Sequence, residues 1–156
     1  MKGSYSAKSS VTIHVDAAKL WDALTNPVLI KQYLFGTDAI SDWKEGSSIT
    51  YKGIWQGKSY EDKGVIKKIE PNKLLVSTYW SAFSGLPDSP ESYSTVTYAL
   101  NQLDGETVLT VTQDNIDTKE SAEHSEGNWK IVLESLKKLT DAINKLFADT
   151  LAKRNQ

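Results

Sequence analysis

Few residues of this sequence have the types and spacing that catalysis or metal binding requires. The two histidines, His14 and His124, do not belong to a spacing such as H-x-x-x-H. We expect His14 to be exposed on the polar side of a strand and His124 to be solvated in a loop before the last helix. The chain has no cysteine, which excludes thiolate catalysis and cysteine-bound metals. The sequence therefore predicts no metal site and no cofactor.

Paired carboxylates are the remaining candidates for acid–base chemistry. Glu61 and Asp62 are adjacent, and adjacent side chains of a strand point to opposite faces, so the two cannot act on one substrate. Asp62 alone is a weak catalytic candidate. If Tyr60, Asp62 and Gly64 form the inner face of their strand, Asp62 is an acid in an apolar cavity and a general-acid candidate. The pattern leaves that face open.

Aromatic side chains form the most informative set. The chain has five Trp, seven Tyr and three Phe. Buried Tyr and Trp need partners for their O–H and N–H groups, and a small-molecule site combines apolar walls with a few polar groups. We expect one set to converge inside the fold: Tyr33, Tyr51, Trp55, Tyr98 and Trp129, with either Tyr79 or Trp80. The alternative is a solid core that these rings fill.

Composition limits the classes of function. The chain has 156 residues, 39% of them apolar, a net charge of −2 and a pI of about 5.7. We expect one domain over residues 1–156, with a core over about 9–150, and no nucleic-acid partner. The first residues, "MKGSYSAKSSVTIHV", lack an apolar signal region, and no apolar run is long enough for a membrane span. We therefore expect a cytoplasmic protein.

The elements that would position these residues follow from periodicity. Residues 9–15 alternate as a strand, Asp16 can cap a short helix, and Asn26-Pro27 starts a second one. Strands and turns fill the chain to about residue 116. An apolar stripe then predicts a long amphipathic helix that buries it against the sheet: Trp129, Val132, Leu136, Leu139, Ile143 and Leu146. This order predicts an α+β fold, with a curved antiparallel sheet of about six strands around a long C-terminal helix.

Four stretches resemble a known superfamily in the same order, over about residues 9–147. They are "VDAAKLWDALTNPVLIKQYL", "GVIKKIEPNKLLVSTYW", "STVTYALNQLDGETVLTVTQ" and "EGNWKIVLESLKKL". They are similar to the Bet v 1-like, START-related (SRPBCC) helix-grip superfamily, and within it to the family of the activator of Hsp90 ATPase (AHSA1-like). Three departures stand out: Tyr33 where many relatives carry tryptophan, Gln113 where many carry histidine, and Asn128 inserted between Gly127 and Trp129.

The resemblance implies a cavity between the sheet and the last helix. Gln113 would supply a polar tip, and Trp129 would stand near the mouth. The candidate ligand-binding residues are Tyr33, Tyr51, Trp55, Tyr79, Tyr98, Leu109, Val111, Gln113, Trp129, Val132, Leu133 and Leu136.

Three functions are compatible with these residues. The first is binding of a small hydrophobic or amphipathic ligand, either lipid-like or an aromatic metabolite. The second is contact with a chaperone such as Hsp90. The third is a polyketide cyclase or dehydratase-like enzyme, which needs an acid or base such as Asp62, Tyr51 or Tyr98. We rank the enzyme last. An apolar patch around residues 83–94 would also allow a homodimer.

Overall fold

The computed structural model describes residues 3–154 and forms one antiparallel sheet of seven strands in the order β1-β7-β6-β5-β4-β3-β2. The strands are β1 (Tyr5–Ile13), β2 (Asp38–Ser41), β3 (Ser48–Trp55), β4 (Lys58–Glu70), β5 (Leu74–Tyr79), β6 (Ser94–Leu103) and β7 (Glu106–Ile116). The helices are α1 (Ala17–Thr25), α2 (Pro27–Tyr33), the short 3₁₀ helix η1 (Pro90–Ser92) and α3 (Lys119–Arg154). The predicted helix-grip fold is confirmed, with one strand more than expected. That strand is β2, whose four residues carry too little pattern to be recognised.

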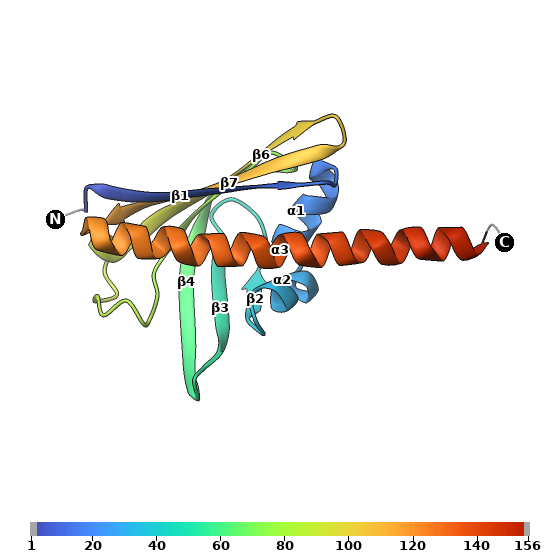
Figure 1. Cartoon of the computed structure of the whole chain (residues 1–156). Coiled ribbons are helices and arrows are strands. Elements are labelled where there is room, and N and C mark those ends of the chain that lie inside the picture. The colour runs from blue at the N-terminus through green and yellow to red at the C-terminus, as the bar shows by residue number, and fades with distance from the viewer. Residues whose placement is uncertain (1–2, 155–156) are drawn as a thin grey trace.

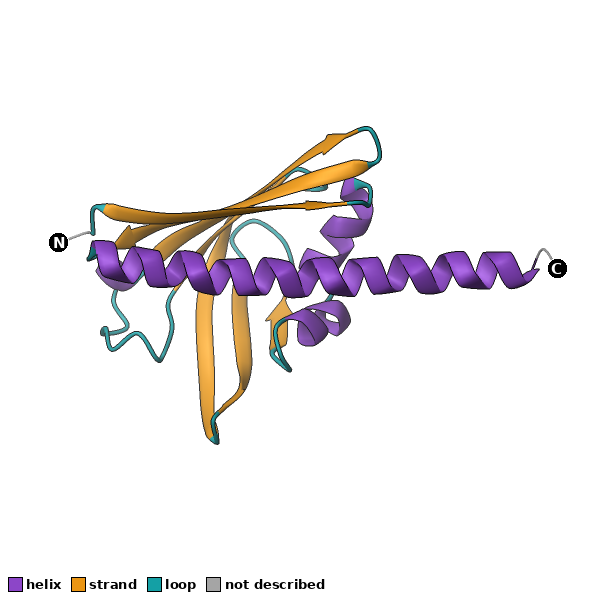
Figure 2. Ribbon diagram, in the orientation of Figure 1, coloured by secondary structure: helices purple, strands orange, loops and turns teal. Residues whose placement is uncertain are grey.

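The sheet curves around α3, which crosses its concave side (Figure 1). The two short helices α1 and α2 lie between β1 and β2 in the sequence and cover one end of the sheet (Figure 2). The strands therefore form one wall and the helices the other. No helix among residues 3–154 combines the length and the apolar character that a bilayer crossing requires.

Local capping explains the short helices. The Asp16 carboxylate accepts a hydrogen bond from the Lys19 N–H (2.9 Å), and the Asn26 side chain accepts one from the Val28 N–H (3.0 Å). Pro27 occupies the first helical position, where its missing N–H has no cost. Both predicted helix starts are confirmed.

The last helix begins earlier than predicted. It starts at Lys119, where the Thr118 hydroxyl accepts a hydrogen bond from the Ser121 N–H (3.0 Å), and its first turn packs Ala122 into a small core cluster. His124 is exposed as expected, but it lies within the helix rather than in a loop before it. Before Trp129 the helix contains Gly127 and many charged residues, so no apolar periodicity marks its first turns in the sequence.

The same helix does not bury its whole stripe. Leu136 is almost fully buried, whereas Ile143 and Leu146 are 42% and 69% exposed. The last part of α3 extends past the sheet (Figure 1). Its 36 residues span about 54 Å at about 1.5 Å per residue, more than the sheet can cover. Helical periodicity predicts which face of the helix is apolar, but it does not predict how much of the helix length the sheet covers.

Gly64 marks a close approach of strands. A Cβ atom at this position of β4 would collide with the backbone carbonyl of Thr78. We expect Gly64→Ala to lower the free energy of unfolding by about 1–3 kcal/mol, because backbone atoms must move to admit the methyl group. Urea denaturation measures this change.

The matched control is Gly127→Ala on α3, where a Cβ would meet no atom within 4 Å. We expect this variant to be more stable than the native chain by about 0.5–1 kcal/mol, because alanine favours the helix. Equal effects at the two glycines would contradict the close approach at Gly64.

Candidate ligand-binding cavity

A cavity of about 440 Å³ lies between the sheet and α3. Its size is within the range of small-molecule sites. Ten of the twelve predicted ligand-binding residues line it: Tyr33, Tyr51, Trp55, Tyr79, Tyr98, Gln113, Trp129, Val132, Leu133 and Leu136. Six of these residues are aromatic, and they lie around one space between the sheet and α3.

Leu109 and Val111 do not line the cavity. Both are completely buried in the main apolar cluster, on the face of β7 that also carries Gln113. Alternation placed them on the correct face. Whether an inward residue meets the cavity or the solid core depends on its position along the strand, and alternation does not show that position.

The sequence did not show which faces of β4 and β5 point inward. In the structure, the inward face of β4 carries Asp62 and that of β5 carries Tyr79. Tyr60 and Asp62 of β4, and Leu75, Ser77 and Tyr79 of β5, line the cavity. Once the inward face of each strand is known, alternation predicts that residues two positions away point inward as well. Trp80 points elsewhere: its Nε1–H donates to the Leu86 carbonyl (3.2 Å), and its ring stacks on Tyr93 at 6.5 Å.

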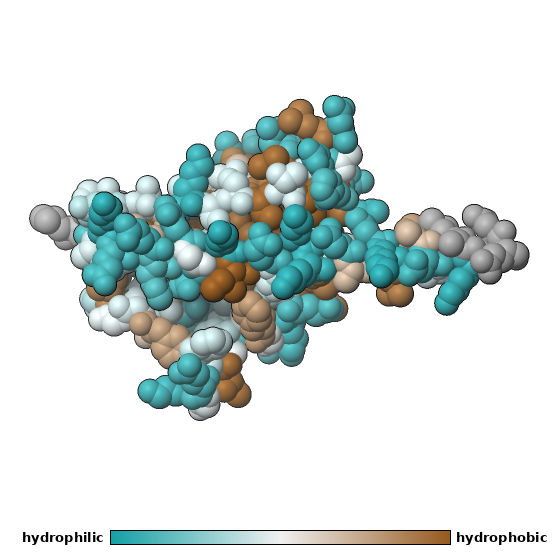
Figure 3. Space-filling view, in the orientation of Figure 1, coloured by the Kyte–Doolittle hydropathy of each residue, from teal (hydrophilic) through white to brown (hydrophobic). Residues whose placement is uncertain are grey.

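The mouth of the cavity is apolar. Phe35, Ile54, Trp55 and Phe83 line it and remain more than half exposed; Trp55 is thus a rim residue rather than an inner wall. The exposed tip of the β3–β4 hairpin carries apolar side chains among polar ones (Figure 3). No periodic pattern marks Phe35 or Phe83, because both lie in loops.

Trp129 is a wall residue held in place by two partners. Its Nε1–H donates to Gln113 Oε1 (2.9 Å), and its ring meets Tyr98 edge to face, with centroids 5.9 Å apart. The Gln113 amide also approaches Ser94 Oγ at 3.4 Å. Gln113 lines the cavity as predicted, but its oxygen already has a partner in Trp129.

Asp62 is the one charged side chain among the described lining residues. It is 9% exposed, and both of its oxygens accept a hydrogen bond, from the Tyr79 O–H (2.8 Å) and from the Ala82 N–H (3.3 Å). Burial, followed by the negative charge of Asp62 and this hydrogen bond, raises the pKa of Tyr79 far above its usual value. Tyr79 is therefore a neutral donor at physiological pH.

Five hydroxyl groups that line the cavity have no hydrogen-bond partner among the described residues. They belong to Tyr33, Tyr51, Ser77, Tyr98 and Ser125, and within residues 3–154 none of them is sealed inside the protein. Each therefore opens to the cavity. Burial is the main cause that raises the pKa of Tyr33, Tyr51 and Tyr98, so these phenols also stay neutral.

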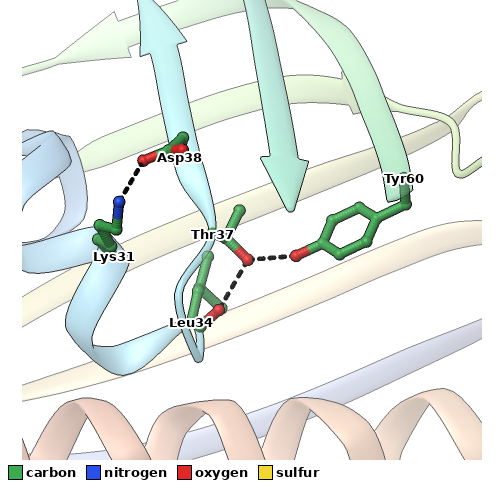
Figure 4. Close-up of polar contacts among 5 residues, drawn as sticks. All are labelled: Lys31, Leu34, Thr37, Asp38 and Tyr60. Carbon is green, nitrogen blue, oxygen red and sulfur yellow. Dashed lines mark hydrogen bonds and ion pairs between the residues drawn. The ribbon is translucent and has the colours of Figure 1, made fainter. Parts of the chain in front are cut away.

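Tyr60 contrasts with these residues because its hydroxyl is occupied. The Thr37 hydroxyl donates to the Leu34 carbonyl (2.7 Å), so it accepts a hydrogen bond from the Tyr60 O–H (Figure 4). Lys31 and Asp38 form an ion pair beside it at 3.0 Å. The bond between Thr37 and Tyr60 fastens the segment after α2 to β4, and the ion pair joins α2 to β2. Together they fix that wall of the cavity.

The buried phenols predict a loss of stability in alkali. The unfolded chain ionises its tyrosines above about pH 10, whereas the folded chain keeps Tyr33, Tyr51, Tyr79 and Tyr98 protonated. Stability is full below that pH and falls above it, by about 1.4 kcal/mol per pH unit for each such tyrosine. Denaturation at a series of pH values measures the slope. Tyr51→Phe should reduce it, whereas Tyr5→Phe, at an exposed position of β1, should not.

The described part of the chain gathers no three His, Asp or Glu side chains in a geometry that could hold a metal ion. Residues 14–141 match the family model described as activator of Hsp90 ATPase homolog 1-like protein. The chain belongs to this family. In this member of the Hsp90 ATPase activator homolog family, Tyr33 and Gln113 both line the cavity.

Solved structures agree with this assignment. A protein of Cytophaga hutchinsonii, solved in solution, is 43% identical and has a TM-score of 0.79, with 94% of this chain and 99% of that chain covered. A crystal structure from Mesorhizobium loti is 24% identical, with 88% and 98% covered and a TM-score of 0.73. The Aha1 dimer of Colwellia psychrerythraea is 22% identical, with 85% and 93% covered and a TM-score of 0.67. The last two show the fold alone. No curated protein matches this chain.

Proposed function

We propose that this protein binds a small amphipathic ligand in the cavity between the sheet and α3. The observation that carries the proposal is a space of about 440 Å³ whose walls are mostly apolar and aromatic, yet which presents five unpartnered hydroxyl groups. These hydroxyl groups open to the cavity, so they can form hydrogen bonds with a molecule bound inside it. A ligand with an apolar body and polar groups would supply the partners for these bonds.

Native mass spectrometry of the protein purified from its own host tests this proposal. We expect one bound small molecule per chain, which solvent extraction then identifies. Val132→Trp would fill the cavity from α3 and should abolish the bound mass. Its neighbour Ile131 is 59% exposed on the outer side of the helix, so Ile131→Trp is the matched control and should keep it. A ligand-free mass for the native chain and both variants would contradict the proposal.

We also propose that the projecting end of α3 mediates self-association. Ile143, Leu146 and Phe147 are exposed there, and the Lys19 ammonium of α1 lies 5.7 Å from the centre of the Phe147 ring. A structural relative with the same fold is described as a dimer, which supports this role. Contact with Hsp90 and an enzymatic activity stay predictions.

Light scattering at several protein concentrations tests the association. We expect a dimer that Leu146→Glu converts to a monomer, because a charge cannot be buried without a partner. Lys145→Glu, at the adjacent exposed position, is the control for a change of charge and should leave the dimer intact. A native chain that remains monomeric at every concentration would contradict this role of α3.

A further inference from the structure

The cavity contains a buried carboxylate without a cation. Asp62 lines it, is nine-tenths buried, and receives hydrogen bonds only from two neutral donors, Tyr79 and Ala82. The described lining residues include no Lys, Arg or His, and no ion pair of residues 3–154 involves Asp62. Buried charges in proteins are normally paired, because desolvation of an isolated ion is costly. Asp62 therefore lacks, among the described residues, the positively charged partner that a buried carboxylate normally has.

Two tyrosines stand beside this carboxylate, and other aromatic rings line the same cavity. Tyr51 on β3 stands directly opposite Asp62 on β4 in the antiparallel register, which brings the two side chains close together on the same face. Tyr79 donates its hydroxyl to the carboxylate from the other side. Tyr98 and Trp129 form an edge-to-face pair within the same cavity. Aromatic faces attract cations, so the rings and the carboxylate favour the same kind of ligand group.

We propose that the ligand is an organic amine, whose protonated nitrogen pairs with Asp62 and whose apolar body lies against α3. An ionised carboxylate can accept about four hydrogen bonds, and the protein supplies two of them. The ammonium N–H groups would take the remaining positions. The inference rests on the proposed function, since it names the class of ligand that the cavity takes.

The same arrangement disfavours anionic ligands such as fatty acids. A carboxylate in this cavity would meet a like charge at Asp62 and no cation among the described lining residues. The free phenol groups could still donate hydrogen bonds to it, but they are neutral. The chemistry therefore predicts an order of affinity for three ligands of ten carbons each: amine first, alcohol second, carboxylate last.

Isothermal titration calorimetry with decylamine, decanol and decanoate, all below their aggregation concentrations, tests this order. We expect decylamine to bind at least about tenfold more tightly than decanol, and decanoate to bind most weakly, because a charge-assisted hydrogen bond is about twice as strong as a neutral one. Asp62→Asn should remove the advantage of decylamine and leave decanol within about threefold. Glu61→Gln, on the adjacent exposed position of β4, is the control and should change nothing.

Each outcome supports or overturns the inference. Equal affinity for amine and alcohol in the native chain would show that Asp62 only holds Tyr79 and Ala82 in place. An unchanged preference for decylamine in Asp62→Asn would do the same. If that variant fails to fold, as circular dichroism would reveal, the order of the three ligands on the native chain decides alone. Binding of none of them would overturn the proposed function itself.

Discussion

Replacing Leu136 with alanine is expected to lower the free energy of unfolding by about 2–5 kcal/mol. The Leu136 side chain is 1% exposed and packs in the main apolar cluster with side chains from the sheet and from α1 and α2. It is therefore a principal link between α3 and the rest of the fold. Because Leu136 also borders the cavity, its removal enlarges an existing space that the protein cannot close. Chemical denaturation followed by circular dichroism measures the loss.

The control is the same substitution further along the helix. Leu146 belongs to the same apolar stripe but is 69% exposed, so Leu146→Ala should change stability by no more than about 0.5 kcal/mol at low protein concentration. A loss at Leu146 as large as that at Leu136 would mean that the projecting part of α3 packs on the monomer in solution. That result would contradict the exposure of Leu146 at the end of α3.

Local chemistry made much of the fold predictable. Asp104 and Gly105 both adopt positive φ angles (46° and 83°), as the two-residue turn between β6 and β7 requires. The threonines on the outer face of that hairpin, such as Thr97 and Thr112, pair across the strands. Helix caps at Asp16 and Asn26 act within three residues. Each of these signals depends on neighbours in the sequence, and each was interpreted correctly.

The inner face of β4 shows where such signals fail. Its register with β5 shifts between Ile66 and Lys68, so the alternation before the shift does not continue after it. Val65, Ile66 and Ile69 consequently give contradictory indications of which face is apolar. Which face of β4 points inward is decided by its pairing with β5 and not by the sequence of β4 alone. The candidate role of Asp62 depended on that face and could only be stated conditionally from the sequence.

Contacts between distant segments account for the other differences. Gln113 was expected to offer its amide to a ligand, but Trp129 occupies the amide oxygen. Thr37 and Tyr60 fix one wall of the cavity through a hydrogen bond between a loop and a strand. Nothing in the spacing of these residues indicates that they meet, because their proximity is set by the curvature of the sheet.

Trp129→Ala is expected to weaken the binding of decanol by about thirtyfold, which corresponds to about 2 kcal/mol. The Trp129 ring forms part of the cavity wall and is only partly buried, so a ligand would cover the surface that the protein leaves open. Decanol is the appropriate probe because it is neutral, and its affinity does not depend on the charge of Asp62. Calorimetry on the native chain and the variant measures the change.

The stability of the same variant separates the two roles that a tryptophan can have here. A wall residue loses one hydrogen bond to Gln113 and one edge contact with Tyr98, which together contribute about 1–3 kcal/mol. A core plug would cost about 3–5 kcal/mol and would leave a new space for the probe. Trp129→Phe keeps an aromatic ring without the N–H group, so it should recover most of the affinity but not the bond to Gln113. If Trp129→Ala binds decanol as well as the native chain and is much less stable, then Trp129 fills the core and the ligand lies elsewhere.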